Sequence, residues 1–363
     1  MPDWAAWADA ECRRIADTGR WREVRDRDDA PSATFASNDY LGLSQHPAVV
    51  AAAHAALDRW GTGAGSARLV AGSRQVHTEL EAELAAWKGT QAALLFPTGY
   101  AANLGVLTTF GPAGARILSD ERNHASIVDG CRLARADVEV YDHADLSHLG
   151  DLLADADAGR TRPTVVVTDT VFSMDGDAAP VDKLAAVCAD HGALLVVDEA
   201  HAVLGPDPDL DGVEHLRVGT LSKTLGSVGG FVAGTRRCID LLANRARSFI
   251  FTTAPAPADA AAALAALRIL RSDEGDRLVA RLRGHVATVA GPAHPSPIVP
   301  VILGDEQAAL DASAALAAQG LVVPAIRPPT VAPGTSRLRV SLSAAHTDAQ
   351  IARLVEALGE LAS

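Results

Sequence analysis

The chain has 363 residues, 48% of them hydrophobic and 21% charged, which is the balance of a soluble globular protein rather than a disordered one. Its 32 basic and 45 acidic side chains give a formal net charge of −13. This charge argues against binding to nucleic acid or to an anionic membrane, because both need clustered Lys and Arg. Any anionic ligand must therefore be held by local charges.

The cysteine spacing and the absence of long apolar runs exclude further classes. The four cysteines form no C-x-x-C pair, so neither a disulfide-rich secreted module nor a zinc site is indicated. The first residues lack the charged-then-apolar pattern of a signal peptide. No apolar run approaches the roughly 18–20 residues that span a bilayer. We therefore expect a cytoplasmic protein with no metal site and no membrane contact.

Helices and strands alternate over the first two thirds of the chain. A helical pattern over Val76–Trp87 stops at Gly89, and the apolar run Ala92–Phe96 that follows is typical of a buried parallel strand. The helical stretch Val181–Asp190 lies among further strand patterns, at Thr164–Thr168, Ala193–Val197 and Leu216–Leu221. Repeated β-α-β units predict a mostly parallel sheet with helices on both faces.

The pattern changes after about residue 245. Ala254–Pro257 interrupts the chain, and an Ala-rich helix is expected to reach about Arg271. Strands are expected at Ile298–Leu303 and Arg337–Leu342, and a capping box at Thr347–Gln350 begins a final helix. We therefore divide the chain into an N-terminal arm that belongs to a small domain (1–40), a large cofactor-binding domain (41–245) and a small C-terminal α+β domain (246–363).

One strand pattern ends in a carboxylate, at Leu194–Asp198, and His201 follows three residues later. In open α/β sheets ligands bind outside the carboxyl ends of the strands, where Asp198 should lie. Taken alone, the segment fits equally well an aspartate that caps a helix beside an incidental histidine.

Lys223 lies just past another strand pattern and is flanked by hydroxyl and glycine residues. Partial desolvation there lowers the pKa of a lysine and makes its amine a Schiff-base nucleophile. A Walker loop needs Gly where this chain has Ser222, and the S-x-x-K pattern needs Ser where it has Thr220. A solvated loop lysine remains the alternative.

Three more turns follow strands. Phe96–Asn103 passes through Gly99 into a helix whose free N–H groups can hold a phosphate, and Tyr100 can lie against a flat ring. Asn123–Ser126 and Val171–Asp177 are the other two. Each of these turns alone is a weak signal.

Their order along one sheet indicates a pyridoxal phosphate site. The phosphate is expected at the helix N-terminus and the ring on His124. The pyridine nitrogen is expected to pair with Asp198, the phenolic oxygen with His201 and the aldehyde with Lys223.

The sequence resembles the fold-type I pyridoxal phosphate enzymes and, within them, the α-oxoamine synthases. The motifs typical of that family run nearly end to end, at Asn38–Leu43, Asn123–Ser126, Phe172–Asp177 and Ser341–Thr347. Arg271–Asp276 and Ala325–Val331 resemble the branch that forms 8-amino-7-oxononanoate in biotin biosynthesis. The chain departs from the family after His201, where Ala202–Gly205 replaces the usual Gly-Thr-Gly and a short acidic loop follows.

The resemblance implies a fold-type I α/β transferase, with a mostly parallel seven-stranded sheet in a large domain and a small α+β domain. It implies a homodimer with the active site at the interface. It also implies an acyltransferase that uses pyridoxal 5'-phosphate to condense L-alanine with a pimeloyl thioester of coenzyme A or acyl carrier protein, releasing CO2 and free thiol. A sister synthase of the glycine C-acetyltransferase or 5-aminolevulinate synthase type is the alternative, and a non-catalytic cofactor-binding or regulatory domain is a second class.

The same resemblance implies roles for individual residues. The catalytic set is Lys223, His124, Asp198 and His201. The further cofactor contacts are Gly99, Tyr100, Ser173, Thr220 and, from a neighbouring subunit, Thr252 and Thr253. The substrate contacts are His124, Arg339 with Asn38 for the amino-acid carboxylate, and Arg20 with Thr330 for the acyl chain. The alternative for Arg339 is a solvated strand arginine, and for Arg20 a solvated helix face.

Overall fold

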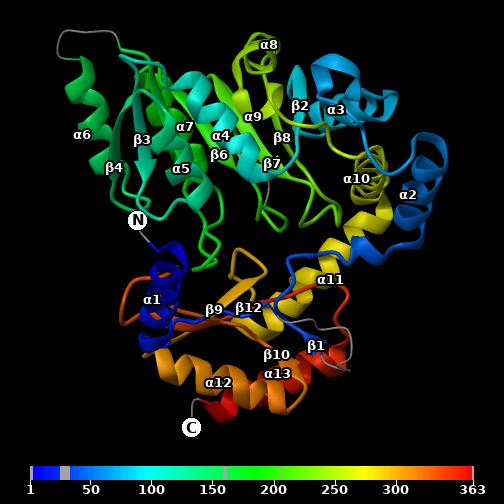
Figure 1. The fold of residues 1–363 in the computed structure, drawn as a ribbon, viewed down its shortest axis with the longest axis vertical. Helices are drawn as coiled ribbons and strands as arrows, with labels where there is room; N and C mark the ends of the chain where they lie inside the picture. Colours follow the sequence, from blue (N-terminus) through cyan, green and yellow to red (C-terminus); the bar gives the residue numbers. More distant parts are fainter. Residues whose placement is uncertain (1–2, 25–32, 158–161, 206, 362–363) are drawn as a thin grey trace.

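A computed structural model describes residues 3–24, 33–157, 162–205 and 207–361 of the chain. Two lobes are visible, and α11 (yellow) runs from one toward the other (Figure 1). The larger lobe contains a seven-stranded sheet in the order β2-β8-β7-β6-β5-β3-β4. Its strands are β2 Ala92–Phe96, β3 Arg116–Asp120, β4 Asp137–Tyr141, β5 Thr164–Asp169, β6 Leu194–Asp198, β7 His215–Thr220 and β8 Gly230–Gly234.

The pairing of these strands confirms the expected mostly parallel sheet. β4, β3, β5, β6 and β7 pair in parallel, and β8 runs antiparallel to both of its neighbours, β7 and β2. A parallel sheet must be covered on both faces, so its strands are apolar throughout. The sequence shows this directly, since Val165, Val166 and Val167 of β5 are all buried.

Alternate residues of one strand pack into different cores. Val165 and Val167 lie with Val106 and Ile127, which come from helices on one face of the sheet. Val166 lies with Leu184 of a helix on the other face. The helices of this lobe, with one 3₁₀ and one π-helical turn, are α2 Pro47–Trp60, α3 Gln75–Trp87, α4 Gly99–Phe110, α5 Ala125–Leu133, α6 Leu146–Asp157, α7 Val181–Asp190, α8 Arg236–Arg245, α9 Arg247–Ile250, α10 Pro257–Leu270, η1 Leu43–Gln45 and η2 Arg68–Gly72.

The smaller lobe combines both ends of the chain. Its antiparallel sheet has the order β11-β12-β9, and β1 pairs in parallel with β10. Its elements are α1 Trp4–Asp17, β1 Ala33–Thr34, α11 Asp273–Ala290, β9 Ile298–Gly304, α12 Glu306–Ala318, β10 Leu321–Val322, β11 Ala325–Ile326, β12 Ser336–Ser341 and α13 Asp348–Leu361. The domain boundaries at residues 40 and 245 remain a prediction. α9 and α10, which follow residue 245, pack against α4, α2 and α3 of the larger lobe.

Local signals place several elements within a residue or two of their observed ends. The capping box before α13 forms as expected, because Thr347 N donates to Gln350 Oε1 at 2.8 Å and Gln350 N donates to Thr347 Oγ1 at 3.2 Å. Across the residues the structure describes, no helix combines the length and the apolar character needed to cross a membrane.

The turn after β5 brings the two lobes into contact. Gly176, in this turn, has a φ of +71°, which favours glycine, and its carbonyl accepts a hydrogen bond from Ser296 Oγ at 2.7 Å. A Cβ placed on Gly176 would lie 2.0 Å from the carbonyl oxygen of Ile298, the first residue of β9. Close backbone approach at this point therefore joins the larger lobe to the sheet of the smaller one.

We predict that Gly176→Ala destabilises the protein by at least about 1–2 kcal/mol, because the left-handed conformation alone costs that much for a residue with a Cβ. Chemical denaturation measures the free energy of unfolding. Gly284→Ala is the matched control, since nothing lies within 4 Å of a Cβ at that helical position. If Gly176→Ala were as stable as Gly284→Ala, the close approach of the Gly176 turn to β9 would not constrain the fold.

Candidate active site

The carboxylate of Asp198 is buried where β6 ends. Its Oδ1 accepts a hydrogen bond from Ala200 N at 2.9 Å, and its Oδ2 accepts one from Asn103 Nδ2 at 2.7 Å. Asn103 lies one turn into α4, and the sequence analysis assigned it no role. Its only sequence signal is its position one helical turn after Gly99. The two bonds fix the direction of the carboxylate.

Lys223 follows β7, and its Nζ lies 2.9 Å from Nε2 of His201. Burial lowers the pKa of the Lys223 ammonium, while the charges of Asp198 and Asp169 oppose this and Arg339 adds to it. The expectation of a partly desolvated lysine therefore agrees with its surroundings. A lysine with a lowered pKa reaches its nucleophilic amine form more readily.

His201 is buried between Lys223 and a residue from the N-terminal segment. Its Nδ1 lies 2.6 Å from the hydroxyl of Tyr40, which is itself fully buried. Burial lowers the pKa of His201 well below its ordinary value, and the charges of Lys223 and Arg339 lower it further. His201 is therefore a neutral imidazole near pH 7.

Arg339 of β12 enters the site from the smaller lobe and is only 5% exposed. Both terminal nitrogens of its guanidinium lie 3.2 Å from Asn38 Oδ1, Nη1 donates to Ser341 Oγ at 2.8 Å, and Nε donates to the carbonyl of Ser173. Among the described residues no carboxylate pairs with it. A buried guanidinium without an acidic partner is suited to bind a carboxylate from a ligand, and the solvated-arginine alternative is wrong.

His124 caps the N-terminus of α5 at the edge of the site. Its Nδ1 lies 2.8 Å from Ser126 Oγ, and its backbone N–H donates to Asp169 Oδ2 at 2.7 Å. Desolvation by the surrounding protein lowers the pKa of the His124 imidazole, and the charge of Asp198 opposes this. Because Asn103 Nδ2 bonds both Ser126 and Asp198, one amide connects the His124 turn to the end of β6.

The N-terminus of α4 lies beside the strand that precedes Lys223. A Cβ on Gly99, the first residue of α4, would lie 3.3 Å from Cβ of Thr220, the last residue of β7. The first N–H groups of a helix have no acceptor within the helix and favour an anion. The Tyr100 hydroxyl donates to Asp129 Oδ2 at 2.5 Å, which holds its half-exposed ring over α5.

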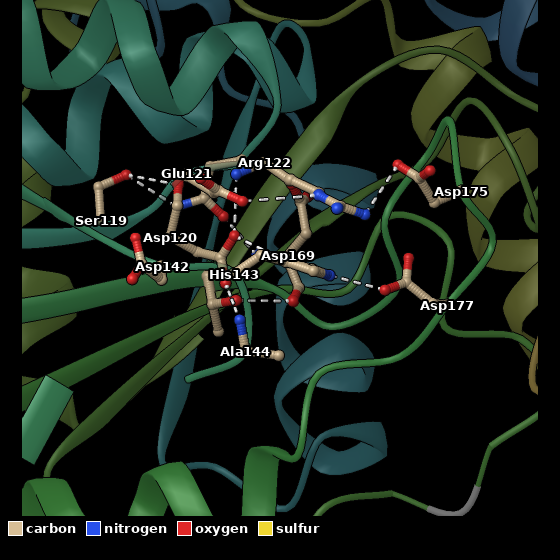
Figure 2. A network of polar contacts seen from close by, with 12 residues as sticks. Ser119, Asp120, Glu121, Arg122, Asp142, His143, Ala144, Asp169, Asp175 and Asp177 are labelled. Carbon is tan, nitrogen blue, oxygen red and sulfur yellow. Dashed lines mark hydrogen bonds and ion pairs between the residues drawn. The ribbon is translucent and has the colours of Figure 1, made fainter. Parts of the chain in front are cut away.

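A histidine that the sequence analysis missed fixes the turn that carries Ser173. His143 lies between two aspartates (Figure 2), with Nδ1 3.0 Å from Asp120 Oδ1 and Nε2 2.7 Å from Asp177 Oδ2. Burial alone would lower the pKa of His143, but the hydrogen bonds and charges of the two aspartates outweigh it, so the pKa lies above its ordinary value. The one sequence signal for this contact was its partner Asp120, a carboxylate at the end of a strand.

A groove of about 730 Å³ opens between the lobes and is lined by Arg20, Thr330, Arg122 and Arg337, among others. Arg20 is paired with Glu306 through an Nη2–Oε1 distance of 2.8 Å, so its charge is already balanced. The Thr330 hydroxyl accepts from Arg22 Nη2 at 3.3 Å. The structure therefore places Arg20 and Thr330 in one groove, and their contact with the acyl substrate remains a prediction.

Thr252 and Thr253 lie between α9 and α10 and are partly and largely exposed, respectively. In a single chain, none of the described contacts joins either of them to Lys223, His201 or Asp198. Their assignment to the phosphate of a neighbouring subunit remains a prediction.

The residues at this edge of the sheet fit pyridoxal phosphate. The carboxylate of Asp198 is oriented, an amine of lowered pKa lies beside a neutral imidazole, and a helix N-terminus lies next to Thr220. Asn103 Oδ1 is also buried and has no hydrogen-bond partner among the described atoms. Such a donor set matches a ring that carries a basic nitrogen, an aldehyde and a phosphate.

Comparison with known proteins agrees with this assignment. A model of the family "Aminotransferase class I and II" matches residues 32–358. An 8-amino-7-oxononanoate synthase of Methylobacterium sp. (strain 4-46) is 49% identical over 96% of this chain and 92% of its own length. That of Anaeromyxobacter dehalogenans is 51% identical over 89% of this chain and 84% of its own length.

Solved structures are similar over nearly the whole chain. A serine palmitoyltransferase of S. paucimobilis, with bound PLP–myriocin, matches with a TM-score of 0.89 and 30% identity, covering 98% of this chain and 96% of its own. An 8-amino-7-oxononanoate synthase of Francisella tularensis matches with a TM-score of 0.75 and 27% identity, covering 91% of this chain and 97% of its own.

We predict that His143→Gln destabilises the protein more at pH 6 than at pH 9. The pKa of His143 is higher in the folded than in the unfolded protein, so its protonated form stabilises the fold. This contribution is complete below the unfolded pKa of about 6.5 and is lost as the pH rises through the folded value. From the usual strength of hydrogen bonds to charged groups, we expect the variant to be less stable than the wild type by about 1–2 kcal/mol at pH 6. Denaturant titration from pH 6 to 9 measures it.

His148→Gln is the control for this experiment, because the partly exposed His148 ring lies against Asp142, with Nδ1 3.2 Å from both its Oδ2 and its backbone N, and should contribute little. A stability difference for His143→Gln that stays constant from pH 6 to 9 would contradict the ionised bridge.

Proposed function

The chain belongs to the aminotransferase class I and II family, in the branch of the 8-amino-7-oxononanoate synthases, and from this membership we propose how its site works. The reaction is the decarboxylative condensation of L-alanine with a pimeloyl thioester, which yields 8-amino-7-oxononanoate, CO2 and a free thiol in biotin biosynthesis. The protein is a pyridoxal-phosphate-dependent acyltransferase. The individual substrates and residue roles below are our proposals.

The buried guanidinium of Arg339, which pairs with none of the described carboxylates, is the observation that carries the proposal. It lies within electrostatic range of Lys223 and His201 and bonds Asn38. An α-amino acid that binds beside Lys223 needs a cationic partner for its carboxylate. A planar guanidinium can bind that carboxylate through two parallel hydrogen bonds. Asn38, whose Oδ1 accepts from both terminal nitrogens, orients the guanidinium.

Three residues prepare the proton transfers. Lys223 has the lowered pKa of a general base and removes the Cα proton of the bound amino acid with its free amine. When bound, pyridoxal phosphate supplies the electron sink that accepts the electron pair left at Cα. Asp198 would hold a proton on the ring nitrogen, and the bonds from Asn103 and Ala200 orient its carboxylate. His201 would form a hydrogen bond with the ring oxygen.

The groove between the lobes supports the acyl half of the reaction. Asn123 and Met174 line it, and they directly adjoin in sequence the site residues His124 and Ser173. Its wall at Pro328–Pro333 is rich in proline and offers apolar surface to a pimeloyl chain, and Arg20 and Arg337, each paired with an acid, also line it. We assign Arg20 and Thr330 to the acyl substrate on this basis, and His124 to the thioester oxygen or the amino-acid carboxylate.

A second copy of the chain would complete the phosphate site through Thr252 and Thr253. Large apolar side chains near these residues are exposed, namely Leu69, Val70 and Phe251, at 58%, 81% and 69%. Ala254 N donates to Ser66 O at 3.0 Å, so the two segments that carry these side chains lie together. Such a surface favours association of two copies beside the site.

A thiol-release assay with paired substrates tests the proposed function. Alanine with pimeloyl-CoA should release thiol, whereas glycine with acetyl-CoA should release little. The Lys223→Ala protein is the control, and it should release no thiol and lack the visible absorption of lysine-bound pyridoxal phosphate. Thiol release with glycine and acetyl-CoA but none with alanine would assign a sister synthase. Cofactor binding without thiol release from any pair would assign a non-catalytic protein.

We predict that Arg339→Ala raises the KM for alanine well over tenfold, because it removes charge-assisted hydrogen bonds of about 1.5–3 kcal/mol. Steady-state kinetics at saturating acyl thioester give the value. Arg353→Ala is the control, since Arg353 lies on α13 in the smaller lobe and its Nη2 donates to the backbone carbonyl of Gln319. An unchanged KM for alanine in Arg339→Ala would place the carboxylate elsewhere.

A further inference from the structure

Tyr40 connects two parts of the site that the proposed mechanism treats separately. It is fully buried, and its hydroxyl lies 3.1 Å from Asn38 Oδ1 and 2.6 Å from His201 Nδ1. Asn38 belongs to the carboxylate-binding pair with Arg339, and His201 lies against Lys223. The hydroxyl therefore stands in an unbroken row of polar contacts that runs from Arg339 to Lys223.

The state of one imidazole nitrogen determines that of the other. A neutral imidazole carries one hydrogen, so either Nδ1 or Nε2 of His201 is the donor and the other is the acceptor. His201 stays neutral because of its burial and the positive charges of Lys223 and Arg339 around it. What the Tyr40 hydroxyl does at Nδ1 therefore decides whether Nε2 accepts or donates at Lys223.

Two hydrogen arrangements satisfy every group without moving a heavy atom. In the first, Tyr40 donates to Asn38 Oδ1, His201 Nδ1–H donates to the Tyr40 oxygen, and Nε2 accepts from the Lys223 ammonium. In the second, Tyr40 donates to Nδ1, and Nε2–H donates to the neutral Lys223 amine. The two differ by the one proton that Lys223 releases to solvent or takes from a substrate.

We propose that Tyr40 is a positioning residue that selects the tautomer of His201 and thereby sets the basicity of Lys223. A hydroxyl can donate or accept, so it keeps the buried imidazole hydrogen-bonded in both protonation states of the lysine. Phenylalanine at this position could do neither. The proposal rests on the proposed function only in treating Lys223 as the working base, because the contacts themselves belong to the chain alone.

Loss of the hydroxyl should favour the neutral lysine. With phenylalanine at position 40, the first arrangement leaves a buried N–H without an acceptor, whereas the second leaves only an unfilled lone pair. Orphaned buried N–H groups are the rarer and more costly of the two. The Tyr40→Phe protein should therefore hold His201 as the Nε2–H tautomer, and the pKa of Lys223 should fall by about one unit.

The titratable and charged groups facing Lys223 do not change in this variant. They are Asp198 and Asp169 at the strand ends, Arg339 from the smaller lobe, and His201 and His124 from the loops after β6 and β3. A shift in the titration of Lys223 would therefore report the hydrogen-bond arrangement at His201.

The experiment measures the pH dependence of Lys223 labelling by acetic anhydride in the cofactor-free full-length protein, read out by mass spectrometry of the peptide that carries it. Tyr40→Phe should shift the midpoint down by about one unit. Tyr141→Phe is the matched control, because Tyr141 is equally buried but packs in a separate core with Leu118 and Leu149, and its midpoint should match the wild type. A folded Tyr40→Phe protein with an unshifted midpoint would overturn the proposal.

A second measurement observes the imidazoles of the wild-type protein directly. Two-bond ¹H–¹⁵N spectra of the wild-type imidazoles, with His201 assigned by loss of its signal in His201→Asn, report which ring nitrogen carries the hydrogen. The protonated nitrogen should change from Nδ1 to Nε2 as the pH rises through the Lys223 midpoint. One unchanging tautomer across that range would refute the proposal. Neither readout depends on thiol release, so failure of the proposed function would be seen separately.

Discussion

The buried carboxylate of Asp198 is the constraint on which the rest of the site depends. A carboxylate out of water costs several kcal/mol unless hydrogen bonds and nearby charges compensate. Asn103, Ala200 N and the Lys223 charge supply that compensation here. Because Asn103 lies in α4, satisfying Asp198 also docks the helix N-terminus beside β7. The same residue that would protonate a cofactor ring therefore organises the phosphate end of the site.

The two lobes contribute different chemistry to one space. The larger lobe supplies the carboxylate of Asp198, the amine of Lys223 and the N-terminus of α4, at the carboxyl ends of its strands. The smaller lobe supplies Arg339, a cation that none of the described carboxylates neutralises. The lobes stay in register through backbone approach at Gly176 and through Arg337, whose Nη1 lies 2.6 Å from Asp175 Oδ1. Under the proposed function, a substrate carboxylate on Arg339 would be held by the smaller lobe, while the base Lys223 belongs to the larger one.

The net charge of −13 has a specific consequence for anionic ligands. Most arginines near the groove are paired with acids, as Arg20 is with Glu306 and Arg337 with Asp175. Of the four arginines that are buried among the described residues, Arg116, Arg217 and Arg337 are paired with acids and Arg339 is not. This arrangement gives an acidic protein a buried position suited to a carboxylate, instead of a general attraction for anions.

Local patterns in the sequence were sufficient for the class of fold, the strands β2, β5, β6 and β7, and the candidate residues Asp198, His201 and Lys223, because strand-end polar residues of a parallel sheet must meet at one edge. They could not reveal Asn103, His143 or Tyr40 as partners. Each of these acts through contacts between segments far apart in the chain, and hydrogen bonds between such segments leave no periodic signal. The sequence alone determined which chemistry the chain carries. Only the tertiary structure decided which hydrogen bonds orient it, since a buried polar group takes its partners from whatever the packing brings within about 3 Å.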